Sequence, residues 1–151
     1  MNIKEYLNSL LAGCWEKIVV QGGKLERSPS AVGYLLFGIW LYCQKRWIEI
    51  SAIEYRYDEY WLSISIMDIV PIPEPSKVNN PPRQLLTTFP DDCRLDKLST
   101  DGVEAVVSGD LERADGEILS KEPLILRSPS GDKFEVAAST KFPGNIEIIS
   151  I

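Results

Sequence analysis

The chain of 151 residues contains no histidine. Histidine is the usual general base, the commonest metal ligand and the side chain whose ordinary pKa lies closest to neutral pH. Its absence excludes histidine-dependent catalytic triads and histidine metal sites. Any chemistry in this protein must therefore depend on other side chains.

Cysteine is also scarce. Cys14, Cys43 and Cys93 form an odd number at wide, unrelated spacings. Such spacing fits neither a disulfide framework nor a zinc knuckle. We expect free thiols in a reducing compartment.

Long apolar runs are missing as well. Val32–Cys43 is about half as long as a bilayer crossing requires and contains Gly33 and Gly38. At the N-terminus, Glu5 stands where a signal peptide has its basic start. We therefore expect no membrane association and a cytoplasmic location.

Basic residues are outnumbered, with 16 Lys and Arg against 22 Asp and Glu, which gives a net charge of -6. The negative field disfavours nucleic acid as a partner, because phosphate backbones are repelled.

Hydrophobic residues make up 44% of the chain, enough to build a core. The length predicts one domain, residues 1–151.

The first segment is predicted to be a helix that ends near Ala12, before Gly13. Its apolar residues recur at helical spacing: Ile3, Tyr6, Leu7, Leu10 and Leu11.

The remainder of the chain has the character of β-structure, since β-branched and aromatic residues dominate it. Strands are predicted in the ranges 15–21, 32–42, 47–56, 60–69, 84–89, 103–108, 118–126, 134–139 and 146–149. Residues 24–27 are expected to form a short strand or a loop after Gly22-Gly23, and the proline-rich stretch 71–82 is expected to be a long connection. One short helix followed by many strands is typical of an antiparallel barrel or sandwich. A barrel is favoured because closure removes exposed strand edges, and we expect the helix to close one end of it.

Three groups of residues are candidates for a site. The aromatic residues Trp40, Trp47, Tyr55, Tyr57, Tyr60 and Trp61 either stack on a flat conjugated ligand or pack in the core. The acidic residues Asp110, Glu112, Asp115 and Glu117 lie around a turn, where they either meet a basic partner or ligand nitrogens or form a solvated hairpin tip. Arg127 follows an apolar strand and is either a bidentate partner for a carboxylate or a surface arginine.

Two stretches of the chain resemble a known family. The opening Met1–Tyr6 with Ala12-Gly13-Cys14-Trp15, and the later Val70–Pro75 followed by Arg83–Leu86, are similar to the S/U-type phycobiliprotein bilin lyases. The runs 99–102 and 124–128 are more loosely similar to later strands of that family.

The resemblance implies a mainly β, antiparallel lipocalin-like barrel with a short N-terminal helix. Such a barrel binds an open-chain tetrapyrrole, a bilin, and delivers it to a cysteine of a phycobiliprotein subunit, in a cyanobacterial cytoplasm or a plastid stroma. No metal and no cofactor besides the bilin substrate is implied. The residues expected to bind the ligand are Arg127 for the propionates, Asp110 or Glu112 for the pyrrole nitrogens, and Trp15 and Trp61.

The chain also departs from the family pattern. The segment Glu16–Gln21 lacks the arginine usual there, and the common histidines are absent. The chain therefore suits a divergent lyase that pairs with a paralogous lyase subunit, a carrier without attachment activity, or a barrel of another kind. A second hypothesis is a non-catalytic acidic module, of inhibitor or immunity type, that recognises a basic partner.

Overall fold

The computed structural model describes residues 2–13, 17–28, 31–43, 45–67, 85–86, 104–107, 109–127, 129, 131 and 133–150. Its elements are α1 Ile3–Leu11, β1 Lys17–Ser28, β2 Ala31–Cys43, β3 Arg46–Glu54, β4 Tyr60–Met67, β5 Leu85–Leu86, β6 Glu104–Val107, β7 Leu111–Ala114, β8 Glu117–Ser120, β9 Leu124–Arg127, β10 Lys133–Ala138 and β11 Ile146–Ser150. The predicted class, mainly β with one short N-terminal helix, is confirmed for the described residues. Among them, no helix has the length and apolar character needed to cross a membrane.

The helix α1 begins with a capping box. The Asn2 side chain accepts a hydrogen bond of 2.8 Å from the Glu5 backbone N–H, and the Glu5 carboxylate accepts one of 3.3 Å from the Asn2 N–H. Both contacts satisfy amide groups that a helix start leaves without partners. The helix ends at Leu11 with Ala12 as its C-cap, so the predicted helix is confirmed nearly to the residue.

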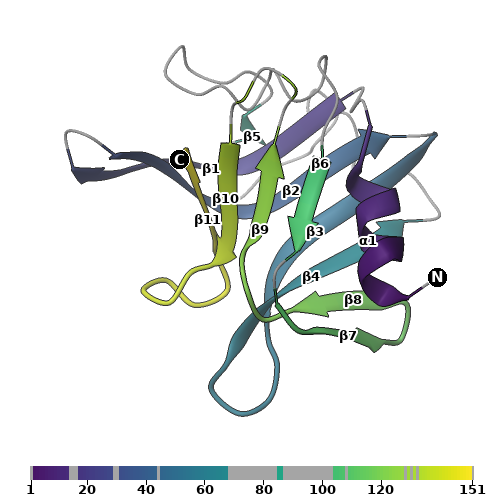
Figure 1. Cartoon of the computed structure of the whole chain (residues 1–151). Coiled ribbons are helices and arrows are strands. Elements are labelled where there is room, and N and C mark those ends of the chain that lie inside the picture. The colour runs from purple at the N-terminus through teal and green to yellow at the C-terminus, as the bar shows by residue number, and fades with distance from the viewer. Residues whose placement is uncertain are drawn as a thin grey trace.

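The strands form one antiparallel sheet in the order β6-β9-β10-β11-β2-β3-β4-β8-β7, and β1 pairs with β2 and with β5 (Figure 1). The pairing of β11 with β2 joins the C-terminal strand to the N-terminal half of the chain. The expected antiparallel arrangement is therefore confirmed.

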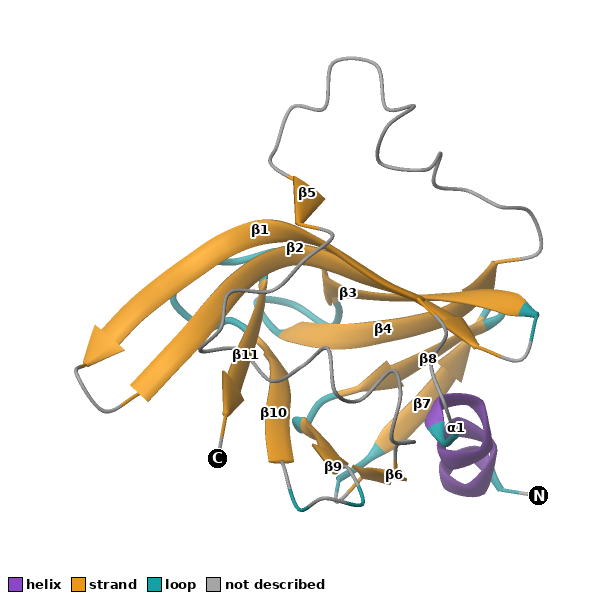
Figure 2. Ribbon diagram, turned by 90° about the horizontal axis from the view of Figure 1, so that it is seen from above, coloured by secondary structure: helices purple, strands orange, loops and turns teal. Residues whose placement is uncertain are grey.

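The sheet curls, but its described strands do not close into a barrel. Strands β6 and β7 end the hydrogen-bonded order, and α1 contacts both of them. Figure 2 shows the sheet bent round so that β6 and β7 approach each other beside α1. The described strands therefore do not form the closed barrel that we expected, and α1 does not lie across one end of it. The helix instead packs against both edge strands, β6 and β7, whose pairing would complete a barrel.

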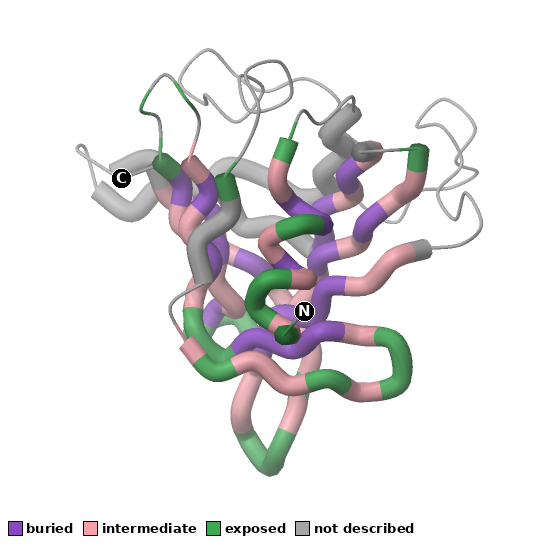
Figure 3. Tube along the Cα trace, turned by 45° about the vertical axis from the view of Figure 1, so that its right-hand side comes forward, coloured by how far each residue is buried: buried purple, intermediate pink, exposed green. Residues whose placement is uncertain are grey.

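The core lies inside the curl. Leu62 and Ile64 on β4 are buried, and they meet Leu7 and Leu10 of α1 in one cluster. Buried and half-buried residues alternate along β9 and within β3 and β10 (Figure 3), which is the period of two that a strand imposes, whereas residues 61–64 of β4 are all buried. The whole cluster is Leu7, Leu10, Leu11, Ile39, Leu41, Ile48, Ile50, Leu62, Ile64, Ile118, Leu124, Leu126, Phe134, Val136, Ile146 and Ile148.

Two strand predictions need correction. The single strand expected over 118–126 is two strands, β8 and β9, separated by a bend at Lys121 and Glu122 and by Pro123, which has no N–H to donate to a ladder. The break expected at Gly22-Gly23 is absent, since β1 continues to Ser28 with a register shift between Gln21 and Gly22. A bulge thus accommodates the glycines without ending the strand.

The acidic turn is a tight hairpin between β7 and β8. Asp115 and Gly116 both have positive φ, 46° and 83°, as a two-residue hairpin turn demands. The predicted turn is confirmed, and the strand β7 before it was missed because its sequence, Leu-Glu-Arg-Ala, is short and polar.

Candidate functional site

A pocket of about 490 Å³ lies at one end of the curled sheet. It is formed by the turn between β3 and β4, the bend between β8 and β9, and the connection from β10 to β11, which lie at the same end of the molecule in Figure 1. Its volume falls in the range of small-molecule pockets, roughly 300–1,000 Å³. The pocket is lined by Asp58, Glu59, Tyr60, Trp61, Lys121, Glu122, Ala138, Ser139, Thr140 and Pro143.

The turn between β3 and β4 has an unusual backbone. Arg56 and Asp58 have φ values of 55° and 64°, which residues other than glycine seldom adopt. The Tyr55 N–H donates to the Glu59 carbonyl at 2.8 Å, and the Glu59 N–H donates to the Arg56 carbonyl at 3.1 Å. These two hydrogen bonds hold the turn in one conformation and direct its side chains.

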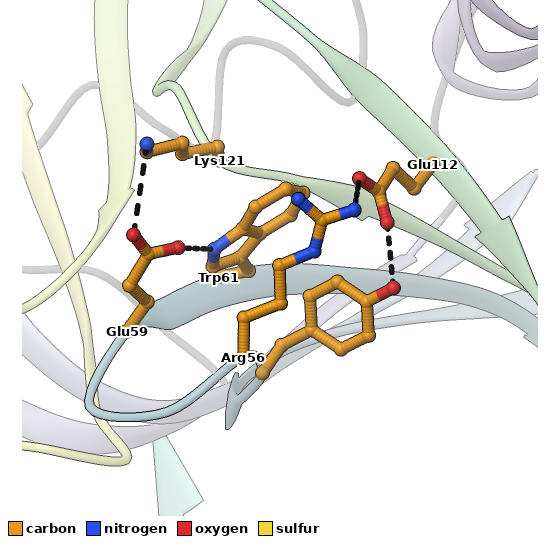
Figure 4. A network of polar contacts seen from close by, with 6 residues as sticks. Arg56, Glu59, Trp61, Glu112 and Lys121 are labelled. Atoms are coloured by element: carbon orange, nitrogen blue, oxygen red, sulfur yellow. Dashed lines mark hydrogen bonds and ion pairs between the residues drawn. The ribbon is translucent and has the colours of Figure 1, made fainter.

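Trp61 forms part of the pocket wall and is 2% exposed. Its Nε1 donates a hydrogen bond of 3.0 Å to one Glu59 carboxylate oxygen, and the other oxygen lies 3.7 Å from Lys121 Nζ (Figure 4). The Lys121 and Glu59 side chains are 51% and 43% exposed, so their ion pair is solvated and weak. The Lys121 ammonium therefore lies at the pocket with about half of its side chain exposed.

A second group of contacts supports the other side of Trp61. The Tyr55 hydroxyl donates to Glu112 at 2.5 Å, and the Arg56 guanidinium is hydrogen-bonded to the same carboxylate. The guanidinium carbon lies 5.6 Å from the centroid of the Tyr55 ring and 5.6 Å from that of Trp61, within reach of cation–π attraction. The two rings meet edge to face at 4.9 Å.

These contacts also act on the charge of Arg56. Hydrogen bonding with the Tyr55 side chain, first, and the charge of Glu112, second, raise the pKa of Arg56 above its ordinary value. The guanidinium is thus firmly charged, and its partner is Glu112. We infer that Arg56 orders the turn and leaves Lys121 as the cation facing the pocket.

The structure brings together two of the five residues predicted to bind a ligand. Glu112 and Trp61 belong to one cluster, joined through Tyr55 and Arg56 (Figure 4). Asp110 is exposed, directly before β7, and Trp15 lies outside the described residues. Sequence reasoning did not select Arg56, Glu59 or Lys121, because surface charges in a turn carry no signal of a partner more than 50 residues away.

Arg127 lies elsewhere on the sheet. It pairs in register with Glu104 across β6 and β9, its Nε donates to the Glu104 carboxylate at 3.0 Å, and it follows the buried Leu126. Successive residues of a strand point to opposite faces of the sheet. Because the side chain of Leu126 is buried in the core, the side chain of Arg127 points away from the core. Arg127 is not among the residues that line the pocket, and its role toward a ligand carboxylate stays a prediction.

The other aromatic candidates on β2 and β3 form cross-strand pairs. Trp40 Nε1 donates to Glu49 at 2.8 Å, and the rings of Tyr42 and Trp47 lie 5.3 Å apart. Such pairs stabilise a sheet and do not require a ligand. These contacts favour the packing interpretation for Trp40 and Trp47.

Within the described ranges, no group of three or more His, Cys, Asp or Glu side chains is arranged to hold a metal ion. Comparison with known proteins found no matching family model, no matching curated protein and no matching solved structure.

Proposed function

We propose that this protein binds an open-chain tetrapyrrole in the pocket beside the β3–β4 turn and assists its attachment to a cysteine of a phycobiliprotein subunit. The observation that carries the proposal is the pocket of about 490 Å³, which combines an aromatic wall, a lysine and carboxylates. A bilin is flat and conjugated, and it carries propionates and pyrrole nitrogens. Each of these features has a complementary group in the pocket.

We infer that the curled sheet corresponds to a lipocalin-like barrel in which α1 lies between the edges β6 and β7. A sheet of this kind holds a ligand at its open end. The position of the pocket at one end of the strands supports this assignment.

Different pocket residues would contact different parts of the ligand. The half-buried Tyr60 offers a ring surface to the conjugated ligand, the buried Trp61 forms part of the pocket wall, and Lys121 pairs with a propionate. Glu122 and Asp58 supply carboxylates for the pyrrole nitrogens. In the family that the sequence resembles, these roles belong to arginines and an acid, so Lys121 would replace an arginine here.

Attachment would depend on positioning. The acceptor thiol adds across an exocyclic carbon–carbon double bond of the tetrapyrrole, so that the sulfur–carbon bond forms as the π bond breaks and the thiol proton goes to the neighbouring carbon. The pocket contributes by fixing the orientation of the tetrapyrrole and limiting its side reactions. The absence of histidine from the chain agrees with such a mechanism.

The first test is spectroscopic. Phycocyanobilin added to the purified protein should change its absorption spectrum, because a bound bilin is held in one shape. Lys121→Ala should weaken binding roughly tenfold, the effect of losing one charge-assisted contact of about 1.4 kcal/mol.

The matched control is Lys133→Ala. Lys133 is an exposed lysine at the start of β10, whereas the pocket lies at the end of that strand, at Ala138. The control should bind like the wild type. An unchanged spectrum with the wild-type protein would reject bilin binding and favour the acidic, non-catalytic module.

Attachment is tested separately by co-expression with bilin and candidate phycobiliprotein subunits, with and without a paralogous lyase subunit. A coloured covalent adduct is expected. Binding without any adduct would make the protein a carrier and not a lyase.

A further inference from the structure

Two residues that do not line the pocket contact the loops that form it. Glu112 accepts hydrogen bonds from Tyr55 and Arg56 at the β3–β4 turn. Gly109 lies against Glu122 in the bend between β8 and β9. Gly109 and Glu112 belong to one short stretch of chain, which leads into β7, and neither is a lining residue.

We propose that Gly109 and Glu112 are positioning residues, which fix two of the pocket loops from outside and so give the pocket its shape before a ligand enters. For the identity of the ligand this rests on the proposed function, whereas the positioning rests on contacts within the chain. Glu112 then acts through Tyr55 and Arg56 and does not itself touch the ligand. Such preorganisation lowers the ordering cost of binding.

The β3–β4 turn needs support of this kind. Arg56 has a φ of 55°, and a residue other than glycine keeps this conformation only where its surroundings hold it there. The Glu112 carboxylate makes two contacts at this point, one with the Arg56 guanidinium and one of 2.5 Å with the Tyr55 hydroxyl. The pocket residues 58–61 follow directly after the turn begins. Loss of the carboxylate should therefore release this part of the pocket wall together with the turn.

The same carboxylate acts on Trp61 through Arg56. The guanidinium carbon lies 5.6 Å from the centroid of the Trp61 ring, and the ring donates to Glu59 on its other side (Figure 4). Because the Arg56 side chain is 61% exposed, solvent screens its attraction to Glu112. The contribution of Glu112 is therefore to hold two groups of the turn at once, and not the strength of one ion pair.

Gly109 supports the second loop by allowing a close approach. A Cβ atom at this position would lie 2.5 Å from Glu122 Cβ and closer still to Glu122 Cγ, which is too short for carbon atoms that are not bonded. Gly109 does not have a positive φ, so the site requires the absence of a side chain and not a special backbone conformation. The Glu122 side chain thus lies on the Gly109 backbone, and this contact fixes its place at the pocket.

The first experiment measures amide hydrogen exchange and phycocyanobilin affinity in Glu112→Ala. The Tyr55 and Glu59 amides, which donate within the turn, should exchange about tenfold faster than in the wild type, because the turn opens more easily. Phycocyanobilin should bind about tenfold more weakly, since the competent form of the pocket is less populated. Glu112→Gln, which keeps an acceptor for the Tyr55 hydroxyl, should lie between Glu112→Ala and the wild type.

The matched control is Glu135→Ala, which removes another half-buried carboxylate that does not line the pocket and should leave both measurements unchanged. Unchanged exchange in a folded Glu112→Ala protein would overturn the positioning role, and so would faster exchange with unchanged affinity. Failure of the wild type to bind phycocyanobilin would instead reject the proposed function. The exchange rates would then still decide whether Glu112 fixes the turn.

Gly109 is tested by a double-mutant cycle with Glu122. Gly109→Ala should weaken phycocyanobilin binding about tenfold and leave the exchange of the turn amides unchanged, because it acts on the other loop. In a Glu122→Gly background the atoms that the new methyl group would meet are gone, so Gly109→Ala should cause no further loss of affinity or stability. A further loss in that background, or unchanged affinity in the single variant, would overturn the positioning role of Gly109.

Discussion

The interior of the curled sheet and the cluster at the β3–β4 turn are stabilised in different ways. In the interior, residues such as Ile50, Ile64 and Phe134 are buried in one large hydrophobic cluster. At the turn, the buried Trp61 is surrounded by Tyr55, Arg56 and charged groups that make directional contacts. The interior depends on apolar area, whereas the turn depends on a few specific partners.

This difference explains which region is suited to bind a ligand. Apolar packing is non-directional and leaves no group to recognise a polar molecule. The turn cluster combines flat rings with a lysine and carboxylates beside an open pocket, and its supporting contacts keep these groups in place. The comparison predicts large stability effects in the interior and small ones at the turn and on the outer face.

The largest effect is expected for Phe134→Ala. Phe134 is 2% exposed in the core cluster, and removing such a ring costs about 3–5 kcal/mol of unfolding free energy. Chemical denaturation of the variant should give this loss. Phe142→Ala is the matched control, since the same change at an exposed ring should alter stability little. Equal losses in the two variants would contradict the assignment of the core.

A smaller effect is expected for Tyr55→Phe, which removes only the hydroxyl that bonds to Glu112 at 2.5 Å. The loss should be about 0.5–1.5 kcal/mol, the usual net worth of one hydrogen bond. Trp61 fluorescence should also change, because the Glu112 carboxylate that loses the hydroxyl also binds Arg56, whose guanidinium carbon lies 5.6 Å from the centroid of the Trp61 ring. Tyr57→Phe, at a residue that is 93% exposed, should change neither quantity. An unaltered Tyr55→Phe protein would show that the turn is ordered without the Tyr55–Glu112 hydrogen bond.

The smallest effect on stability is expected for Arg127→Ala. The Arg127 and Glu104 side chains are 42% and 62% exposed, and such solvated pairs contribute about 0–1 kcal/mol. Its effect on bilin affinity is the informative measurement. The sequence predicts that Arg127→Ala weakens bilin binding by about 1.5–3 kcal/mol. Arg127→Lys should also weaken it, because lysine lacks the two parallel donors of the guanidinium.

Titration of Arg127→Ala and Lys121→Ala with phycocyanobilin compares the two locations directly. Weaker binding by the Arg127 variant would extend the site to the β6–β9 edge. Unchanged affinity in a folded Arg127 variant would leave it as a surface residue paired with Glu104 and would restrict the site to the pocket.

The sequence by itself determined the local features of this protein. The apolar spacing in residues 3–11 predicts α1, the β-branched and aromatic residues of 60–69 predict β4, and Asp115-Gly116 predicts a tight turn. These features depend on neighbours within a few residues, whose periodicity is visible in one dimension.

Only the tertiary structure decided how the strands are ordered and which side chains meet. Tyr55 and Glu112 are 57 residues apart, and no local pattern in either segment indicates the other. The same holds for α1 between β6 and β7, and for the pairing of Arg127 with Glu104, 23 residues away. Such contacts depend on the register and curl of the whole sheet, which is the sum of many weak pairings and not a property of any one segment.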